Sequence, residues 1–144
     1  MADAEIYFAN RLAFETDPSD VYAAQRAGES FALVDVRGAD AWAQGRITGS
    51  LHMPYRQISR RAPFELDPRV PVVVYCWSPG CNAGQKGALE FARLGYEVRE
   101  MIGGYEYWVR EGQPYENDHG ALERVFDPTV MAVHGEHAQP LARA

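Results

Sequence analysis

The stretch VVVYCWSPGCNAGQKGALEFARLGY, residues 72–96, decides the fold of this chain. Its first four residues belong to an apolar, β-branched run that begins two residues earlier, Val70–Tyr75. This run lacks polar alternation and therefore predicts a strand buried on both faces. Pro71 has no backbone N–H to donate to a neighbouring strand, so it fits this strand only at its start. After a loop of glycine, proline and serine, small and apolar residues recur at helical spacing as far as Leu94, and Gly95 ends the helix.

Strands and helices alternate along the rest of the chain as well. The apolar spacing and the turn residues predict helices or helical turns over residues 4–14, 18–27, 39–44, 55–60 and 105–111, and strands over residues 31–36, 50–52 and 96–101. Beyond residue 116 the pattern weakens, and we expect one helical turn at Leu122, Val125 and Phe126 before a loosely held tail. The alternation predicts an α/β domain with a mainly parallel sheet.

The composition, with 47% hydrophobic and 24% charged residues, is ordinary for a globular domain that buries a core without disulfides or a structural metal. The formal net charge of −6 disfavours nucleic acid and anionic membranes as partners. The first residues lack the basic start and apolar run of a secretory signal, and no apolar run is long enough to span a bilayer. Two cysteines, Cys76 and Cys81, make a poor disulfide framework for a secreted domain, so we expect a cytoplasmic location.

Cys76 occupies the position where ligands bind in parallel α/β sheets, directly after a buried strand and before a loop that opens into a helix. Free amides of such a loop and the dipole of the helix favour anions, including a thiolate, which is the nucleophilic form of cysteine. A free cysteine is often only a small buried hydrophobe, but this context favours a reactive Cys76. Cys81 is either a second reactive thiol or a residue that lines the loop.

Four motifs, in chain order, resemble those of the rhodanese family. They are Leu33–Arg37 followed by Asp40 and Trp42, then Gly45–Pro54 (GRITGSLHMP), then Val73–Cys76 with its loop and helix, and finally Ile102–Trp108 (IGGYEYW). Each motif alone is weak, whereas four of them in order at the family's spacing are specific. The resemblance implies a rhodanese domain over residues 17–115, with an N-terminal helix or extension over residues 1–16 and a C-terminal extension or tail over residues 116–144.

The resemblance also implies a fold and a chemistry. The fold is a central five-stranded parallel sheet flanked by helices on both faces. The chemistry is sulfur transfer, in which Cys76 accepts a sulfane sulfur from a small donor anion such as thiosulfate, or from a persulfide, and passes it to a thiol, which can belong to a protein. The loop that would bind the substrate consists of Trp77, Ser78, Pro79, Gly80, Cys81, Asn82 and Ala83. No metal or organic cofactor is implied.

The loop departs from the family pattern in its charge. Common members often carry an arginine five residues after the cysteine, where this chain has Cys81, and no charged residue occurs between Cys76 and Lys86. This departure disfavours thiosulfate as the natural donor, because a dianion binds best beside a cation. The candidates to supply a cation from elsewhere are Arg37, Arg46 and Lys86.

Two further residues have alternative interpretations. Asp35 ends a buried strand and has two possible roles. It either braces the active loop together with Arg37, or it forms a purely structural ion pair with Arg37, and we favour the ion pair. Cys81 can attack a persulfide on Cys76, which would release sulfide and leave a disulfide. The remaining candidates are expected to be structural: Trp42 and Trp108 in the core, His52 as a packing residue, and His134 and His137 as a pair without a metal.

Three functions compete. Sulfur transfer is favoured. The second function, a phosphatase or arsenate reductase of similar fold, is disfavoured. Such enzymes place an arginine six residues after the cysteine to bind the oxyanion, whereas this chain has Asn82 there. The third is a non-catalytic redox-sensing or binding module that uses the Cys76/Cys81 pair. Fold alone does not choose among them, because function resides in the site.

Overall fold

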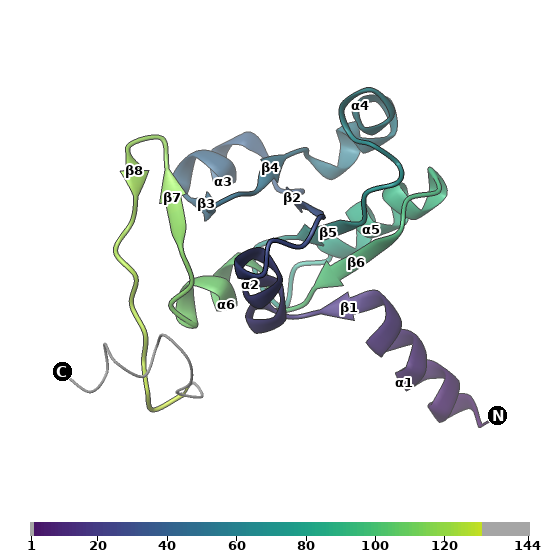
Figure 1. Cartoon of the computed structure of the whole chain (residues 1–144), viewed down its shortest axis with the longest axis horizontal. Coiled ribbons are helices and arrows are strands. Elements are labelled where there is room, and N and C mark those ends of the chain that lie inside the picture. Colours follow the sequence, from purple (N-terminus) through teal and green to yellow (C-terminus); the bar gives the residue numbers. More distant parts are fainter. Residues whose placement is uncertain (1, 131–144) are drawn as a thin grey trace.

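A central sheet of five parallel strands organises the computed structural model, which describes residues 2–130 (Figure 1). The strands lie in the order β1-β6-β5-β2-β4, so the two strongly apolar strands, β5 and β2, are neighbours near the middle. The helices and the sheet strands are α1 (Asp3–Phe14), β1 (Glu15–Thr16), α2 (Pro18–Arg26), β2 (Ala32–Asp35), α3 (Ala39–Gln44), β4 (Leu51–His52), the 3₁₀ helix η1 (Tyr55–Gln57), α4 (Ile58–Glu65), β5 (Val72–Tyr75), α5 (Ala83–Arg93), β6 (Val98–Met101) and α6 (Gly104–Arg110). The predicted α/β fold with a five-stranded parallel sheet is confirmed.

Helices cover both faces of the sheet, and the alternating side chains of β5 divide between two cores. Val72 and Val74 pack with Phe91 beneath α4 and α5 on one face. Val73 and Tyr75 pack with Trp108 beneath α2 and α6 on the other face. All four residues of β5 are buried, which explains why its sequence shows no polar alternation.

A small antiparallel sheet that the sequence analysis did not predict lies beside the main one. It consists of β3 (Arg46–Ile47), β7 (Tyr115–Asn117) and β8 (Gly120–Ala121), in the order β3-β7-β8. Residues 122–126 are not helical, so the expected helical turn there is wrong. The segment instead continues away from the β7–β8 hairpin, where the Leu122 amide donates to the Tyr115 carbonyl and Phe126 forms a bridge with Glu111.

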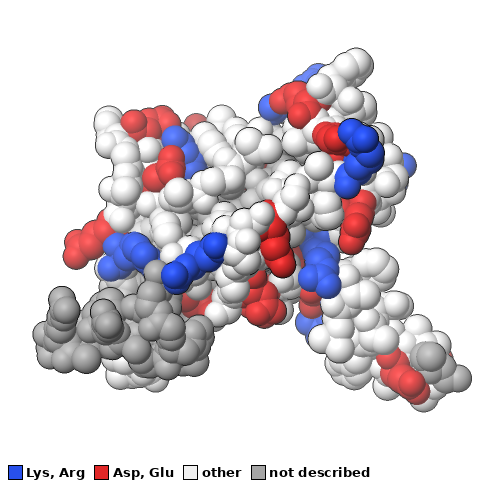
Figure 2. All heavy atoms as spheres, in the orientation of Figure 1, with Lys and Arg blue, Asp and Glu red and all other residues white. Residues whose placement is uncertain are grey.

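The N-terminal helix α1 forms as predicted but packs differently from an ordinary amphipathic helix. None of its residues is buried, and it projects away from the sheet (Figure 1), with Phe8 and Leu12 among its exposed apolar side chains. Much of its surface in Figure 2 is uncharged. The chain then enters β1, which pairs with the edge of β6, so the segment before residue 17 contributes a strand to the sheet.

Other expectations about single residues have mixed outcomes. Trp108 is fully buried as predicted, whereas Trp42 is only half-buried, with its ring stacked on that of His52. His134 and His137 lie outside the described residues. Within residues 2–130, no helix is long and apolar enough to cross a membrane.

Gly87 marks the tightest contact between α5 and the sheet. A Cβ at this position would come within 2.8 Å of Val36 Cγ1, a rigid β-branched side chain of the core. We expect Gly87→Ala to lower the free energy of unfolding by about 1–3 kcal/mol, because overpacking outweighs the gain in helix propensity. Gly80→Ala is the control, since nothing lies within 4 Å of its Cβ, and it should change stability by less than about 0.5 kcal/mol in the same urea titration.

Candidate active site

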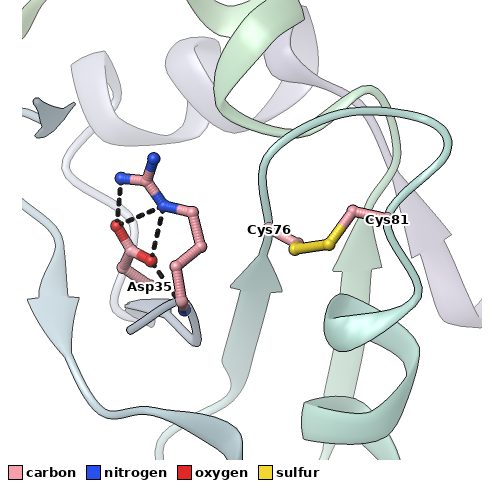
Figure 3. Close-up of a disulfide and its surroundings, with 4 residues drawn as sticks. Asp35, Cys76 and Cys81 are labelled. Carbon is pink, nitrogen blue, oxygen red and sulfur yellow. Dashed lines mark hydrogen bonds and ion pairs between the residues drawn. A yellow bond between two sulfur atoms is a disulfide. The ribbon is translucent and has the colours of Figure 1, made fainter. Parts of the chain in front are cut away.

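Cys76 and Cys81 are joined by a disulfide at the carboxyl edge of the main sheet (Figure 3). Cys76 directly follows β5, and Cys81 lies two residues before α5 begins. Their α-carbons are 6.3 Å apart, which is within the range that a disulfide spans. The fold therefore brings the two cysteines within reach of each other.

The loop that holds both cysteines is fixed by the start of α6. The amide of Tyr105 donates to the Cys76 carbonyl at 2.8 Å, and the amide of Glu106 donates to the Trp77 carbonyl at 2.8 Å. Gly104 makes this approach possible, because a Cβ there would lie only 2.7 Å from the Cys76 carbonyl oxygen, and its φ of 66° is unfavourable for other residues. The Gly103–Gly104 pair is therefore part of the framework of the loop rather than only a turn.

A cavity of about 510 Å³ opens beside the disulfide, and we call it the cysteine cavity. Cys76 is only 5% exposed, whereas Cys81 is half-buried. The loop side of the cavity is lined by Cys76, Ser78, Pro79, Cys81 and Gln85 of α5. The opposite side is lined by Arg11, Glu15, Asp17, Pro18, Glu100, Met101, Ile102, Gly103, Gly104, Tyr107 and Glu111.

Carboxylates dominate the charge of the cysteine cavity. Arg11 is the one cationic side chain that the described part of the chain, residues 2–130, contributes to the lining, and its guanidinium donates to the carboxylate of Glu15 at 3.1 Å. Burial, and then the nearby charge of Glu15, raise the pKa of Glu100 above its ordinary value. The Glu100 carboxyl lies against Gly84 in the first turn of α5, where an added Cβ would be 2.7 Å from its Oε2. The positive end of this helix thus already faces a carboxyl group.

Glu111 adds a second half-buried carboxyl group at the end of α6. Burial, and to a lesser extent the charge of Asp17, raise its pKa from 4.5 to about 7. The cavity therefore gains negative charge as the pH rises through neutrality. With Glu15, Asp17, Glu100 and Glu111 together, the lining favours neutral or cationic ligands over anions.

Asp35 and Arg37 form a buried ion pair at the end of β2 (Figure 3). The Arg37 Nη2 donates to Asp35 Oδ2 at 2.7 Å and to the Gly45 carbonyl at 2.6 Å. The guanidinium carbon lies 4.3 Å from the centre of the Trp77 ring and 4.5 Å from that of Tyr105. Nη1 has no hydrogen-bond partner among the described residues, and these aromatic faces surround the guanidinium instead.

The predicted site residues separate into two groups. Ser78, Pro79 and Cys81 line the cysteine cavity with Cys76. The other candidates lie elsewhere. Trp77 faces a second cavity with Tyr105, Lys86 lies over Tyr55, Arg46 pairs with Asp118, and Asp35, Arg37, Gly80, Asn82 and Ala83 are absent from the lining.

His52 is a packing residue, in keeping with the expectation from the sequence. Its Nε2 lies 2.8 Å from the Arg37 carbonyl oxygen, and its ring stacks on Trp42. Within residues 2–130, no three His, Cys, Asp or Glu side chains are grouped closely enough to hold a metal ion.

The acidic lining of the cavity escaped the sequence analysis. Glu15 precedes the predicted domain, Glu100 lies within a predicted strand, and Glu111 lies at a helix end. The strand order β1-β6-β5 brings Glu15 and Glu100 together beside the loop after β5, and the end of α6 adds Glu111. No local signal singled out Glu100, because the same predicted strand also carries the charged residues Glu97 and Arg99.

Glu111 gives a test of this electrostatic environment. Since its folded pKa is raised to about 7, the folded protein binds more protons than the unfolded chain between pH 4.5 and 7, and stability falls as the pH rises through this window. Glu111→Gln should remove that loss and stabilise the oxidised protein at pH 8 relative to pH 5 by about 1 kcal/mol, a value discounted for solvent screening. Urea unfolding measures it, with the exposed Glu123→Gln as control. Equal pH profiles for wild type and Glu111→Gln would contradict the assignment.

Comparison with known proteins agrees with the geometry. A model of the rhodanese-like domain family matches residues 17–111. The thiosulfate sulfurtransferase GlpE of Pseudomonas putida is 31% identical over 114 residues, which cover 76% of this chain and 97% of that protein. The GlpE protein of Actinobacillus succinogenes is 32% identical over 94 residues, which cover 64% of this chain and 81% of that protein.

Solved structures share the whole architecture. The BH2092 protein of Bacillus halodurans superposes with a TM-score of 0.75 at 30% identity, over 96% of this chain and 97% of that chain. A protein of Lactobacillus plantarum superposes with a TM-score of 0.71 at 31% identity, over 81% of this chain and 100% of that chain. The family match, the sulfurtransferase relatives and the shared fold show that this chain belongs to the rhodanese-like domain family.

Proposed function

We propose that the protein is a sulfurtransferase that carries sulfur as a persulfide on Cys76. The observation that carries this proposal is the position of Cys76, at the carboxyl end of the buried strand β5 and at the wall of the cysteine cavity. Ligands of parallel α/β sheets bind at this edge. The family and the names of the relatives support sulfur transfer in general.

The chemistry starts from the reduced pair of cysteines. The Cys76 thiolate attacks the sulfane sulfur of the donor, a sulfur–sulfur bond forms, and the bond to the donor's leaving group breaks. With thiosulfate the leaving group is sulfite, and with a persulfide it is a thiolate. Amides of the loop from Trp77 to Ala83 would stabilise the anionic persulfide, apart from Pro79, which has no N–H, and Cys81, whose amide donates to the Ser78 carbonyl. The terminal sulfur then passes to an acceptor thiol.

The charge of the cavity favours a persulfide that is neutral or positively charged over thiosulfate. A dianion would approach Cys76 past the carboxyl groups of Glu15, Asp17, Glu100 and Glu111, whereas Arg11 is already bound to Glu15. Neither Arg37 nor Lys86 lines the cavity to offset this repulsion. The physiological donor is therefore proposed to be a persulfide.

A second function, a redox-sensing module without turnover, is favoured by the disulfide between Cys76 and Cys81. In that case the pair would be oxidised and reduced, but neither cysteine would take up sulfane sulfur. The two functions differ in whether a donor adds sulfur to the reduced protein.

Intact mass separates the two functions. We expect the reduced Cys81→Ser variant to gain one sulfur atom from a donor and the Cys76→Ser variant to gain none, because Cys76 holds the position of the nucleophile. The donors are thiosulfate and the persulfide of cysteamine, which carries an ammonium group. If no donor adds sulfur to either variant, while oxidation still joins the cysteines in wild type, the redox module is the function.

Glu15→Gln tests the proposed preference for a donor that is not anionic. The substitution removes one carboxylate from the cavity and releases Arg11, so loading by thiosulfate should become about 3- to 10-fold faster at low salt, with a smaller effect or the opposite effect for cysteamine persulfide. Glu65→Gln is the matched control, because Glu65 forms the same i,i+4 pair with Arg61 on α4, outside the cavity. A thiosulfate rate unchanged in Glu15→Gln would show that the carboxylates do not govern donor choice.

A further inference from the structure

We propose that Cys81 is a resolving nucleophile, which attacks a persulfide on Cys76, releases hydrogen sulfide and leaves the Cys76–Cys81 disulfide for a dithiol to reduce. This inference rests on the proposed function, since it needs the Cys76 persulfide as its starting point. It adds a product, sulfide, and a second substrate class, dithiols, to the same site.

The reach of Cys81 to Cys76 is built into the fold. The disulfide forms with its α-carbons 6.3 Å apart, while the loop keeps its two hydrogen bonds to α6 and the turn from Ser78 to Cys81 closes with a 3.0 Å hydrogen bond. Both cysteines line one cavity. A thiolate held in this way reacts much faster than one that must diffuse in, because folding has already removed its translational freedom.

The different exposures of the two cysteines favour the intramolecular route. Cys76 is 5% exposed, so an external thiol reaches the sulfur atom next to its Cβ with difficulty. Cys81 is half-buried and is therefore the more exposed residue of the disulfide. An incoming reductant thus meets Cys81 first, and Cys76 is the leaving thiolate, free to accept the next sulfur.

The cycle balances in atoms and electrons. The Cys81 thiolate attacks Cys76 Sγ, the bond between Sγ and the terminal sulfur breaks, and that sulfur leaves as HS⁻ with the persulfide proton. The sulfane sulfur is reduced to sulfide while the two cysteines are oxidised to the disulfide. One thiolate of a dithiol then attacks Cys81 Sγ and displaces Cys76, and the second thiol closes the reductant's own disulfide and frees Cys81.

The negative charge of the cavity disfavours reductants that carry net negative charge themselves. Glutathione carries net negative charge and would meet the same carboxylates as thiosulfate, and its mixed disulfide on Cys81 has no second thiol to remove it. A dithiol without net negative charge avoids both obstacles. Dithiothreitol is the neutral probe of this class.

The decisive experiment is a single turnover without oxygen. Reduced, desalted wild type and Cys81→Ser are loaded with thiosulfate, which brings no thiol, or with cysteamine persulfide followed by rapid desalting. We expect wild type to release one sulfide per chain and to lose the mass of two hydrogen atoms. Cys81→Ser should retain the added sulfur and release no sulfide. The loading of Cys81→Ser itself shows that Cys76 takes up sulfur, as the proposed function requires, and circular dichroism of the variant checks that it is folded.

The other outcomes overturn one proposal or both. A stable persulfide in wild type, as in Cys81→Ser, would refute the resolving role and leave the sulfurtransferase proposal intact. Absence of added sulfur on Cys81→Ser, together with no sulfide release by wild type, would refute both proposals. A disulfide that forms equally without donor under the same oxygen-free conditions would also refute the resolving role, because its formation would then not depend on the persulfide.

Turnover gives an independent measure. With limiting dithiothreitol and excess donor, wild type should produce sulfide at a rate about tenfold or more above that of Cys81→Ser, because the variant's buried persulfide must react with an external thiol. Replacing dithiothreitol with glutathione at equal thiol concentration should slow wild type strongly. Equal rates for the two proteins would overturn the resolving role.

Discussion

The buried ion pair of Asp35 and Arg37 is the interaction on which the arrangement of the site depends. Arg37 is 3% exposed, and its guanidinium is held at once by the Asp35 carboxylate, the Gly45 carbonyl and the faces of Trp77 and Tyr105. These partners belong to the end of β2, the corner after α3, the cysteine loop and the start of α6. Removing one member of such a pair leaves an uncompensated buried charge, which costs about 3–5 kcal/mol. The pair thus ties the segments around the cysteines to the most buried part of the sheet.

The same pair explains why the arginine in the first motif does not serve as the missing cation of the loop. Its charge is neutralised by Asp35 and covered by Trp77, and it lies outside the lining of the cysteine cavity. The field at the cysteines is set instead by carboxyl groups from β1, β6 and the end of α6. An interaction that fixes the shape of the loop is therefore separate from the charges that would choose its ligand.

The centre of the fold could be predicted because its strands have a local sequence pattern. Elements that form only by pairing with distant parts of the chain could not be predicted. The run Val72–Tyr75 is buried on both faces and so carries its own signature, and the cysteine that follows it must lie at the carboxyl edge of the sheet. The two-residue strands β1 and β3 carry no such pattern, because they are specified by their partners. The expectation of a helix near Leu122 failed for this reason, since apolar spacing did not reveal the hairpin formed by β7 and β8.

The acidic lining shows the same limit at the site. No spacing in the sequence relates Glu15 to Glu100, yet β1 and β6 pair in parallel with these two residues in register, and Arg11 reaches the same cavity from α1. A strand order that is invisible in the sequence thus determines which charges surround a cysteine that the sequence identifies easily. The chemistry of the nucleophile is local, while the proposed choice of its donor is a property of the whole sheet.

The disulfide connects sulfur loading to the redox state of the protein. Loading and disulfide formation both use Cys76 Sγ, so one chain cannot hold a persulfide and the disulfide at the same time. If the disulfide were only an oxidation product, every oxidised chain would be lost to sulfur transfer until it was reduced. If Cys81 resolves the persulfide, the disulfide is instead the normal end of each cycle, and the supply of dithiol sets the rate at which Cys76 becomes available again. The half-buried position of Cys81 beside the buried Cys76 suits the second case, because the residue whose sulfur a reductant must attack is the more exposed of the two.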